Sequence, residues 1–155
     1  MDEFFLKLAI KEAQKSKKCN GYKVGAVIVK NGLVLSKAYS LESKKYRHAE
    51  ELAIKKCKEN LSGSIIYCTM EPCDYRRSGK KTCCEHIIES KIKKVVYGVF
   101  DPDTYVHCSG IEKLKQAGVE VYHLKTLEQK CKELTPSLPF DKLQLEVAPR
   151  RSLPA

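Results

Sequence analysis

The chain has 155 residues, of which 43% are hydrophobic and 31% charged, and its formal net charge is +10. This length fits one domain with a hydrophobic core of its own, and the composition excludes a disordered chain. No apolar run approaches the ~20 residues that cross a bilayer, so no membrane anchor is expected. The acidic N-terminus is the reverse of a secretory signal and indicates an intracellular protein, expected in the cytoplasm with the nucleus as an alternative.

The eight cysteines indicate metal ligands or small buried residues, because a reducing compartment disfavours disulfides. The positive charge suits an anionic partner, and a phosphorylated metabolite or a nucleic acid would both qualify. Aromatic residues make up only 8% of the chain, with no Trp, which leaves few platforms for stacked bases. We therefore favour a small phosphorylated ligand and keep a nucleic acid as the weaker alternative.

Hydrophobic spacing predicts alternating helices and strands along most of the chain. A helix is expected over residues 2–18, and Asn31-Gly32 is typical of the turn of a hairpin between strands over 24–29 and 33–40. The pattern then predicts helices over 48–60, 83–90, 109–117 and 126–134, and strands over 64–70, 94–100 and 119–124. Residues 135–155 contain four prolines and no clear periodicity, so one folded domain over 1–134 and an extended or flexible tail are expected.

This order of elements predicts an α/β fold, in which helices cover one five-stranded mixed sheet. The first two strands form an antiparallel hairpin, whereas helical crossovers make the last three strands parallel. In such sheets, ligands bind beyond the carboxyl ends of the parallel strands, where the next helices begin. Functional residues are therefore expected at these strand ends.

Two segments at these positions carry the residue types of a metal site. His48-Ala49-Glu50 opens one predicted helix, while Cys73 follows a strand and Cys83 opens the next helix. Catalytic zinc is typically held by three His or Cys ligands, with one position open for water. His48, Cys73 and Cys83 supply this number of ligands, and helix N-termini favour thiolates. The sequence therefore predicts a catalytic Zn²⁺ site.

Glu50 is the expected proton shuttle of this site. Zinc nucleobase deaminases carry His-x-Glu followed by Pro-Cys-x-x-Cys, with the Glu as general acid and base. Here nine residues separate Cys73 from Cys83. The match indicates a hydrolytic deaminase of a pyrimidine-like ring, in which zinc activates water and Glu50 moves protons to the ring and to the leaving ammonia.

The adjacent Cys84 keeps a second interpretation open. Cys83 is preferred as the ligand, because as the first helical residue it lets Ile87 and Ile88 face the core. If Cys84 were a fourth ligand, the site would be a closed structural zinc module without catalysis. The remaining cysteines and histidines have no ligand-like spacing and are expected in the core or at the surface: Cys19, Cys57, Cys68, Cys108, Cys131, His86, His107 and His123.

The segment between Cys73 and Cys83 is basic and offers candidates for substrate binding. Its cations could bind a phosphate through charge-assisted hydrogen bonds or could merely increase solubility, and both interpretations stay open. These cations are Arg76, Arg77, Lys80 and Lys81. Asp101 and Tyr105, after a later strand, are weaker candidates for the mouth of the same site.

Over about residues 4–124, the chain resembles the cytidine deaminase superfamily and, within it, the fungal type of riboflavin-pathway pyrimidine deaminase. The resemblance rests on four motifs: Val24-Gly25-Ala26-Val27, Ser40-x-Glu42 before His48-Ala49-Glu50, Thr69-Met70-Glu71-Pro72-Cys73-x-x-Arg76-x-Ser78-Gly79-x-x-x-Cys83, and Gly110-x-x-x-Leu114-x-x-x-Gly118-Val119. It implies a three-layer α/β/α cytidine deaminase-like fold and a zinc ligand at Cys83. The long segment before Cys83 separates this branch from dCMP deaminases and tRNA adenosine deaminases, which remain the alternative families.

The resemblance also implies a substrate, the 5′-phosphate of 2,5-diamino-6-ribitylamino-4(3H)-pyrimidinone or its ribosyl counterpart. Hydrolysis would give the 5-amino-uracil product and ammonia. The candidate substrate-binding residues are then Arg76, Ser78, Lys80, Lys81, Asp101 and Lys23, the last at a position where relatives often carry Asn. Relatives commonly assemble, so a homo-oligomer such as a dimer is expected.

Overall fold

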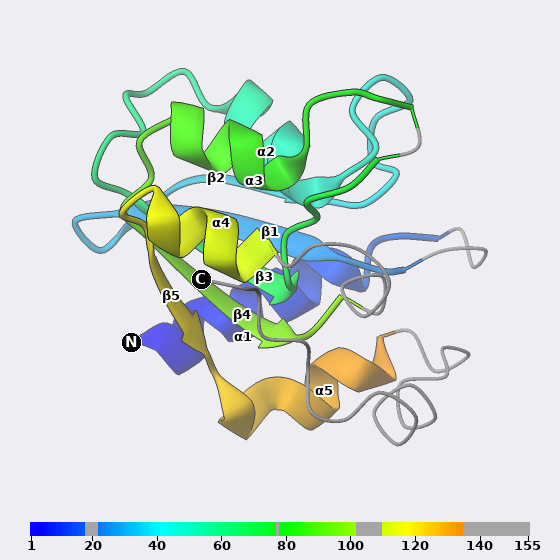
Figure 1. The fold of residues 1–155 in the computed structure, drawn as a ribbon. Coiled ribbons are helices and arrows are strands. Elements are labelled where there is room, and N and C mark those ends of the chain that lie inside the picture. The colour runs from blue at the N-terminus through cyan, green and yellow to red at the C-terminus, as the bar shows by residue number, and fades with distance from the viewer. Residues whose placement is uncertain (18–21, 77, 102–109, 135–155) are drawn as a thin grey trace.

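The computed structural model describes residues 1–17, 22–76, 78–101 and 110–134, and Figure 1 shows how their elements are arranged. The strands are β1 (Gly25–Lys30), β2 (Leu33–Tyr39), β3 (Ile65–Met70), β4 (Lys94–Val99) and β5 (Glu120–His123). The helices are α1 (Asp2–Ala13), α2 (Ala49–Lys56), α3 (Cys83–Glu89), α4 (Gly110–Gln116) and α5 (Glu128–Glu133), with the short 3-10 helix η2 (Lys125–Leu127) before α5. Within these residues, no helix has the length and apolarity that a membrane span needs.

The five strands form a mixed sheet in the order β2-β1-β3-β4-β5, which confirms the predicted sheet. β1 is antiparallel to both β2 and β3, whereas β3, β4 and β5 run parallel. Asn31 and Gly32 turn the β1–β2 hairpin with φ values of 51° and 77°, the left-handed backbone that this type of turn requires. The sequence signal for the hairpin therefore has a direct conformational cause.

Helices cover both faces of the sheet, as Figure 1 shows, with α2, α3 and α4 on one face and α1 and α5 on the other. The predicted three-layer α/β/α fold is confirmed. The central strands accordingly carry apolar side chains that are fully buried, among them Ile28, Ile66, Val95 and Val96. The end of β3 thus projects from a rigid core, and the segment that follows it carries Cys73 and Cys83.

Two helices end several residues earlier than predicted, and for α1 a contact outside the helix accompanies the early end. α1 ends at Ala13, and Ser16 donates from Oγ to the carbonyl oxygen of Ser40 at 2.8 Å, which leads the chain toward the end of β2. α2 ends at Lys56, and Cys57 is already extended with ψ of 126°. Apolar spacing alone carries no information about the contact of Ser16 with Ser40.

At the C-terminal end, the predicted helix over 126–134 is divided into η2 and α5. The helix predicted from residue 109 is described from Gly110 onward. The predicted tail, residues 135–155, lies outside the described residues, as do Cys19, Arg77, Tyr105, His107 and Cys108.

Gly25 sets how closely α1 approaches the sheet. A Cβ atom at this position would collide with the carbonyl oxygen of Ala9 and would lie 2.7 Å from the backbone nitrogen of Ala13. Both obstacles are backbone atoms of α1, so no side-chain rotation relieves them. A glycine is therefore needed here for helix packing rather than for a turn.

We expect Gly25→Ala to lower the free energy of unfolding by about 3 kcal/mol, because overpacking against backbone forces α1 away from β1. Gly63→Ala is the comparison variant, since Gly63 has φ of 80° and open space around its Cβ position. Backbone strain alone should cost that variant about 1 kcal/mol. Urea unfolding measures both, and a smaller loss for Gly25→Ala than for Gly63→Ala would contradict the packing argument.

Candidate active site

The start of α2 places the side chains of His48 and Glu50 close to the same atom, the sulfur of Cys83. His48 is the N-cap, with φ of −87° and ψ of 137°, so its side chain leaves from extended backbone just before the helix. Glu50 lies in the first helical turn. Two residues two positions apart would diverge inside a helix, but here the change of backbone conformation brings both toward Cys83. The Cys83 sulfur lies 3.4 Å from His48 Nδ1 and 3.6 Å from Glu50 Oε2.

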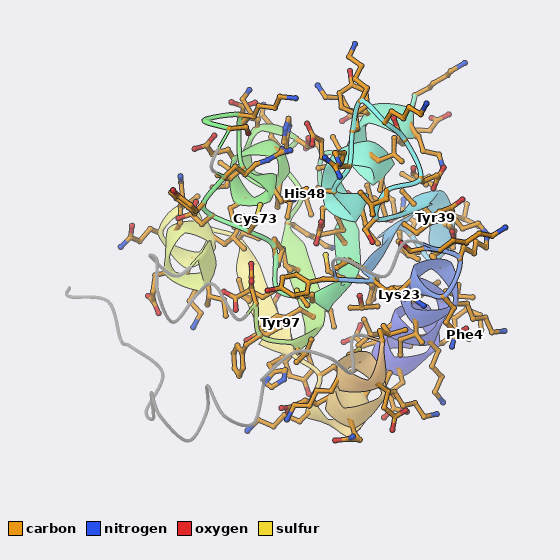
Figure 2. All side chains as sticks on the ribbon, turned by 90° about the vertical axis from the view of Figure 1, so that its right-hand side faces the viewer. Phe4, Lys23, Tyr39, His48, Cys73 and Tyr97 are labelled. Carbon is orange, nitrogen blue, oxygen red and sulfur yellow. The ribbon has the colours of Figure 1, made fainter. Side chains whose placement is uncertain are left out.

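The start of α3 and the end of β3 deliver the two cysteines. Cys83 is the first residue of α3, whose N-cap Thr82 forms a reciprocal capping box with Glu85. Cys73 comes three residues after β3, and its sulfur accepts the backbone N–H of Cys83 at 3.4 Å. Figure 2 shows Cys73 beside His48, and the Cys73 sulfur lies 3.5 Å from His48 Nδ1. The structure thus brings the three predicted ligands together.

This cluster has the donor types and spacing of a zinc site. One ligand atom from each of the three residues lies within 4.8 Å of the other two. Tetrahedral zinc with ordinary bond lengths separates a sulfur from a nitrogen ligand by ~3.5 Å. The two measured sulfur–nitrogen distances, 3.5 and 3.4 Å, agree with this value. An imidazole and two thiols at this spacing therefore suit Zn²⁺.

Cys84 faces away from the cluster, although it adjoins Cys83. Its thiol donates to the carbonyl oxygen of Pro72 at 3.4 Å, and burial strongly raises the pKa of that thiol. A Cβ atom on Gly110 would lie 2.6 Å from the Cys84 sulfur, so the start of α4 packs directly on it. Within the described part of the chain, the metal-binding group consists of one histidine and two cysteines, without a fourth ligand.

The electrostatics of the cluster favour a cation. Hydrogen bonds from Cys83 and His48 lower the pKa of Cys73 to about 4, so this sulfur is a thiolate at neutral pH. The same contact with Cys73, together with burial, raises the pKa of Cys83. His48 has a raised pKa because its ring pairs with the Cys73 thiolate. A metal ion would replace these protons as the positive partner of the thiolates.

Glu50 is poised for proton transfer. Its side chain is almost fully buried, with 4% of its surface exposed, and burial raises its pKa to about 7. A carboxyl group with this pKa both accepts and releases a proton at neutral pH, as general acid–base catalysis requires. Glu50 thus places a carboxyl group with a raised pKa next to the cluster of His48, Cys73 and Cys83.

The predicted substrate-binding residues between Cys73 and Cys83 differ in their surroundings. Arg76 is mostly buried and donates from Nη1 to Glu51 Oε2 at 2.9 Å and to the carbonyl oxygen of Lys81 at 3.2 Å. The ammonium of Lys81 pairs with Glu89 at 2.6 Å. Lys80 is exposed, and its backbone N–H donates to Ser78 Oγ at 3.3 Å. Lys80 and Ser78 thus lie at the surface, whereas Arg76 belongs to the interior.

The other two predicted substrate-binding residues lie elsewhere. Asp101 is buried after β4, and its backbone N–H donates at 3.4 Å to Glu71, two residues before Cys73. Lys23 is half-buried before β1, and Figure 2 shows it apart from His48 and Cys73. Asp101 is therefore linked to the candidate site through Glu71, whereas Lys23 is not adjacent to it in this view.

Sequence reasoning missed Glu51, whose carboxylate contacts both Arg76 and His86. An acidic residue in a first helical turn is ordinarily explained by the helix dipole. Its partners are 25 and 35 positions away along the chain, and no motif spacing connects them. His86, expected as a core or surface residue, is buried, and its Nε2 lies 3.3 Å from Glu51 Oε1.

Comparisons with known proteins find relatives of several kinds. A diaminohydroxyphosphoribosylamino-pyrimidine deaminase from Schizosaccharomyces pombe is 41% identical over 136 residues, covering 84% of this chain and 33% of the relative. A tRNA-specific adenosine deaminase from Bacillus subtilis is 38% identical over 117 residues, which are 70% of this chain and 67% of the relative.

Among solved structures, a diaminohydroxyphosphoribosylaminopyrimidine deaminase/5-amino-6-(5-phosphoribosylamino)uracil reductase from Thermotoga maritima superposes with a TM-score of 0.78 at 35% identity. The match covers 87% of this chain and 39% of that one. This chain thus spans little more than a third of the Thermotoga protein and 33% of the Schizosaccharomyces protein.

The family model described as the cytidine and deoxycytidylate deaminase zinc-binding region matches residues 1–99. The match includes all of β1 to β4 and therefore the segments that carry His48, Glu50, Cys73 and Cys83. The chain belongs to the cytidine and deoxycytidylate deaminase family.

Proposed function

We propose that this chain hydrolytically deaminates a phosphorylated aminopyrimidine of riboflavin biosynthesis, with residues 1–134 as the deaminase domain. One observation carries the proposal: Glu50 lies beside a group of one histidine and two cysteines while Cys84 is turned away. A zinc ion with three protein ligands has a position open for water, as in catalytic sites. A closed structural site would need a fourth protein ligand.

In this proposal, His48, Cys73 and Cys83 hold Zn²⁺. The ion would supply the Lewis acidity that brings the pKa of water close to neutrality. Glu50 takes a proton from the attacking water and delivers it to the ring nitrogen next to the amino-bearing carbon. The water oxygen bonds to that carbon, Glu50 carries the second proton to the amino nitrogen, and ammonia leaves as the ring carbonyl forms. Burial of Glu50 keeps bulk water from competing for these protons.

The proposed substrate is the 5′-phosphate of 2,5-diamino-6-ribitylamino-4(3H)-pyrimidinone or its ribosyl counterpart. The names of the Schizosaccharomyces and Thermotoga relatives support this class of substrate. Lys80, Lys81 and Ser78 are the proposed contacts for the phosphate, since they lie on the segment between the two cysteine ligands. Asp101 is proposed at the mouth of the site, and Lys23 at its periphery.

A phosphorylated metabolite as substrate also supports a location in the cytoplasm. A homodimer belongs to the same proposal, and sedimentation equilibrium of the purified chain tests it. Neither feature changes the chemistry assigned to the metal-binding residues.

A nucleic-acid deaminase is the second candidate. Its support is the 38% identity to the tRNA-specific adenosine deaminase from Bacillus subtilis, together with the net charge of +10. Against it stands the nine-residue segment between Cys73 and Cys83, where the nucleic-acid pattern has two residues. A longer segment at the rim of the site favours a different ligand from a flipped base.

A substrate panel separates the two candidates. We expect zinc-loaded protein to release ammonia from the aminopyrimidine nucleotide, and not from tRNA or single-stranded DNA. Deamination of tRNA without turnover of the pyrimidine would replace the first candidate with the second.

Glu50→Gln should lower the rate of ammonia release by about 10²–10⁴-fold, because the amide cannot carry protons. The zinc content should remain that of the wild type, since Glu50 is not a proposed ligand. Glu59→Gln is the matched control, because Glu59 is exposed and should leave the rate unchanged. A Glu50→Gln variant that keeps the wild-type rate with full zinc would remove Glu50 from the mechanism.

Cys83→Ala and Cys84→Ala form a matched pair of neighbouring substitutions. Loss of a sulfur ligand should strip zinc from Cys83→Ala, whereas Cys84→Ala should retain the wild-type zinc content. Elemental analysis after gel filtration with a weak chelator measures both. Zinc loss from Cys84→Ala with retention in Cys83→Ala would reverse the assignment of the ligand.

A further inference from the structure

Glu51 is the centre of a buried polar cluster beside the metal-binding residues, formed with Arg76 and His86. Its Oε2 accepts Nη1 of Arg76 at 2.9 Å, and its Oε1 lies 3.3 Å from Nε2 of His86. The exposed fractions of the three side chains are 9% for Glu51 and 10% for each partner. Each carboxylate oxygen of Glu51 therefore lies close to a side chain from a different segment of the chain.

These three residues connect the segments that carry the metal-binding side chains. Glu51 follows Glu50 in α2 and is three positions from His48. Arg76 is three positions from Cys73, and its Nη1 also donates to the carbonyl oxygen of Lys81, which leads into α3. His86 is one helical turn beyond Cys83 in α3. A shift of Glu51 would therefore move α2, α3 and the segment between the two cysteines.

We infer that Glu51, through Arg76 and His86, positions the starts of α2 and α3 relative to each other and thereby sets the geometry of the metal site. This inference rests on the proposed function only in naming a metal as the group that is held. Glu51 would be a positioning residue, because it acts through the backbone of the ligand-bearing segments and touches none of the three ligand atoms in the contacts described above.

The burial of the cluster distinguishes it from the exposed Lys81–Glu89 ion pair of the same region. Lys81–Glu89 on the same segment leaves 43% and 58% of its side chains exposed, so solvent screens that pair. A buried pair gains little net stability because its charges lose their hydration, but removal of one partner leaves the other charge without compensation. Such a cluster is suited to fixing one arrangement of α2, α3 and the segment between the two cysteines.

The test measures metal binding rather than turnover. Glu51→Ala, Arg76→Met and the double variant are compared with the wild-type chain by competition of Zn²⁺ with a chelator and by the visible spectrum of the Co²⁺-substituted protein. Residues that orient metal ligands typically contribute 10–100-fold to metal affinity, so each single variant should bind Zn²⁺ about 10-fold or more weakly. The Co²⁺ bands should shift, and the double variant should lose much less than the product of the single losses.

Lys56→Met is the matched control, because it removes an ion pair of α2 with Glu42, at 2.7 Å, that does not involve the segment between the cysteines. It should bind Zn²⁺ as the wild type does. If Glu51→Ala does not fold, Glu51→Gln takes its place, since it keeps the volume and an acceptor for Arg76 and should lose several-fold in affinity.

Two failures are distinguishable. A wild-type chain that binds neither metal would overturn the proposed function itself. A wild-type chain that binds metal, with Glu51 and Arg76 variants of equal affinity and unchanged Co²⁺ spectrum, would overturn the positioning role. Variants that unfold at lower temperature but keep the wild-type Co²⁺ spectrum would also overturn it, because a purely stabilising role predicts that result.

Discussion

The candidate site depends on one constraint: the first residues of α2 and α3 lie next to each other beyond the end of β3. His48 caps α2 and Cys83 begins α3, and their ligand atoms lie 3.4 Å apart. The first N–H groups of a helix have no carbonyl partner within the helix, and each helix start is the positive end of its dipole, so the space between the two starts favours anionic groups. The Cys73 thiolate lies in this space and accepts the first N–H of α3. The helix starts stabilise the negative charge of the sulfur, and the sulfur in turn binds the start of α3.

The sheet supplies the rigidity that this meeting requires. β3 and β4 are neighbouring parallel strands, and the backbone N–H of Glu71 continues their pairing with the carbonyl oxygen of Val99 at 2.8 Å. The chain leaves the sheet at Pro72, directly before Cys73. The buried sheet thus fixes the position of functional groups on the loop, which is the usual arrangement at the carboxyl ends of parallel strands.

The sequence predicted what depends on local signals and missed what depends on distant contacts. The hairpin at Asn31-Gly32 was predictable because Asn and Gly are the residues that most readily adopt the left-handed backbone of this turn. The choice of Cys83 over Cys84 as the ligand, still to be tested by metal binding, followed from its place at a helix start. In contrast, the early end of α1 depends on the bond of Ser16 to Ser40, 24 positions away, and Glu51 meets Arg76 across 25 positions. Hydrophobic periodicity describes one helix or strand at a time and gives no information about such distant pairs.

The two ends of the basic segment are held by hydrogen bonds that do not involve its middle. The carbonyl oxygen of Cys73 accepts the N–H of Cys84 at 3.1 Å, and Thr82 caps α3 through Glu85. Neither attachment uses residues 77–80. Insertions or deletions in this stretch would therefore leave the metal-binding side chains in place while changing the rim of the site. Proteins that evolve from this fold can therefore change substrate through the length of this loop, while the metal-binding residues stay the same.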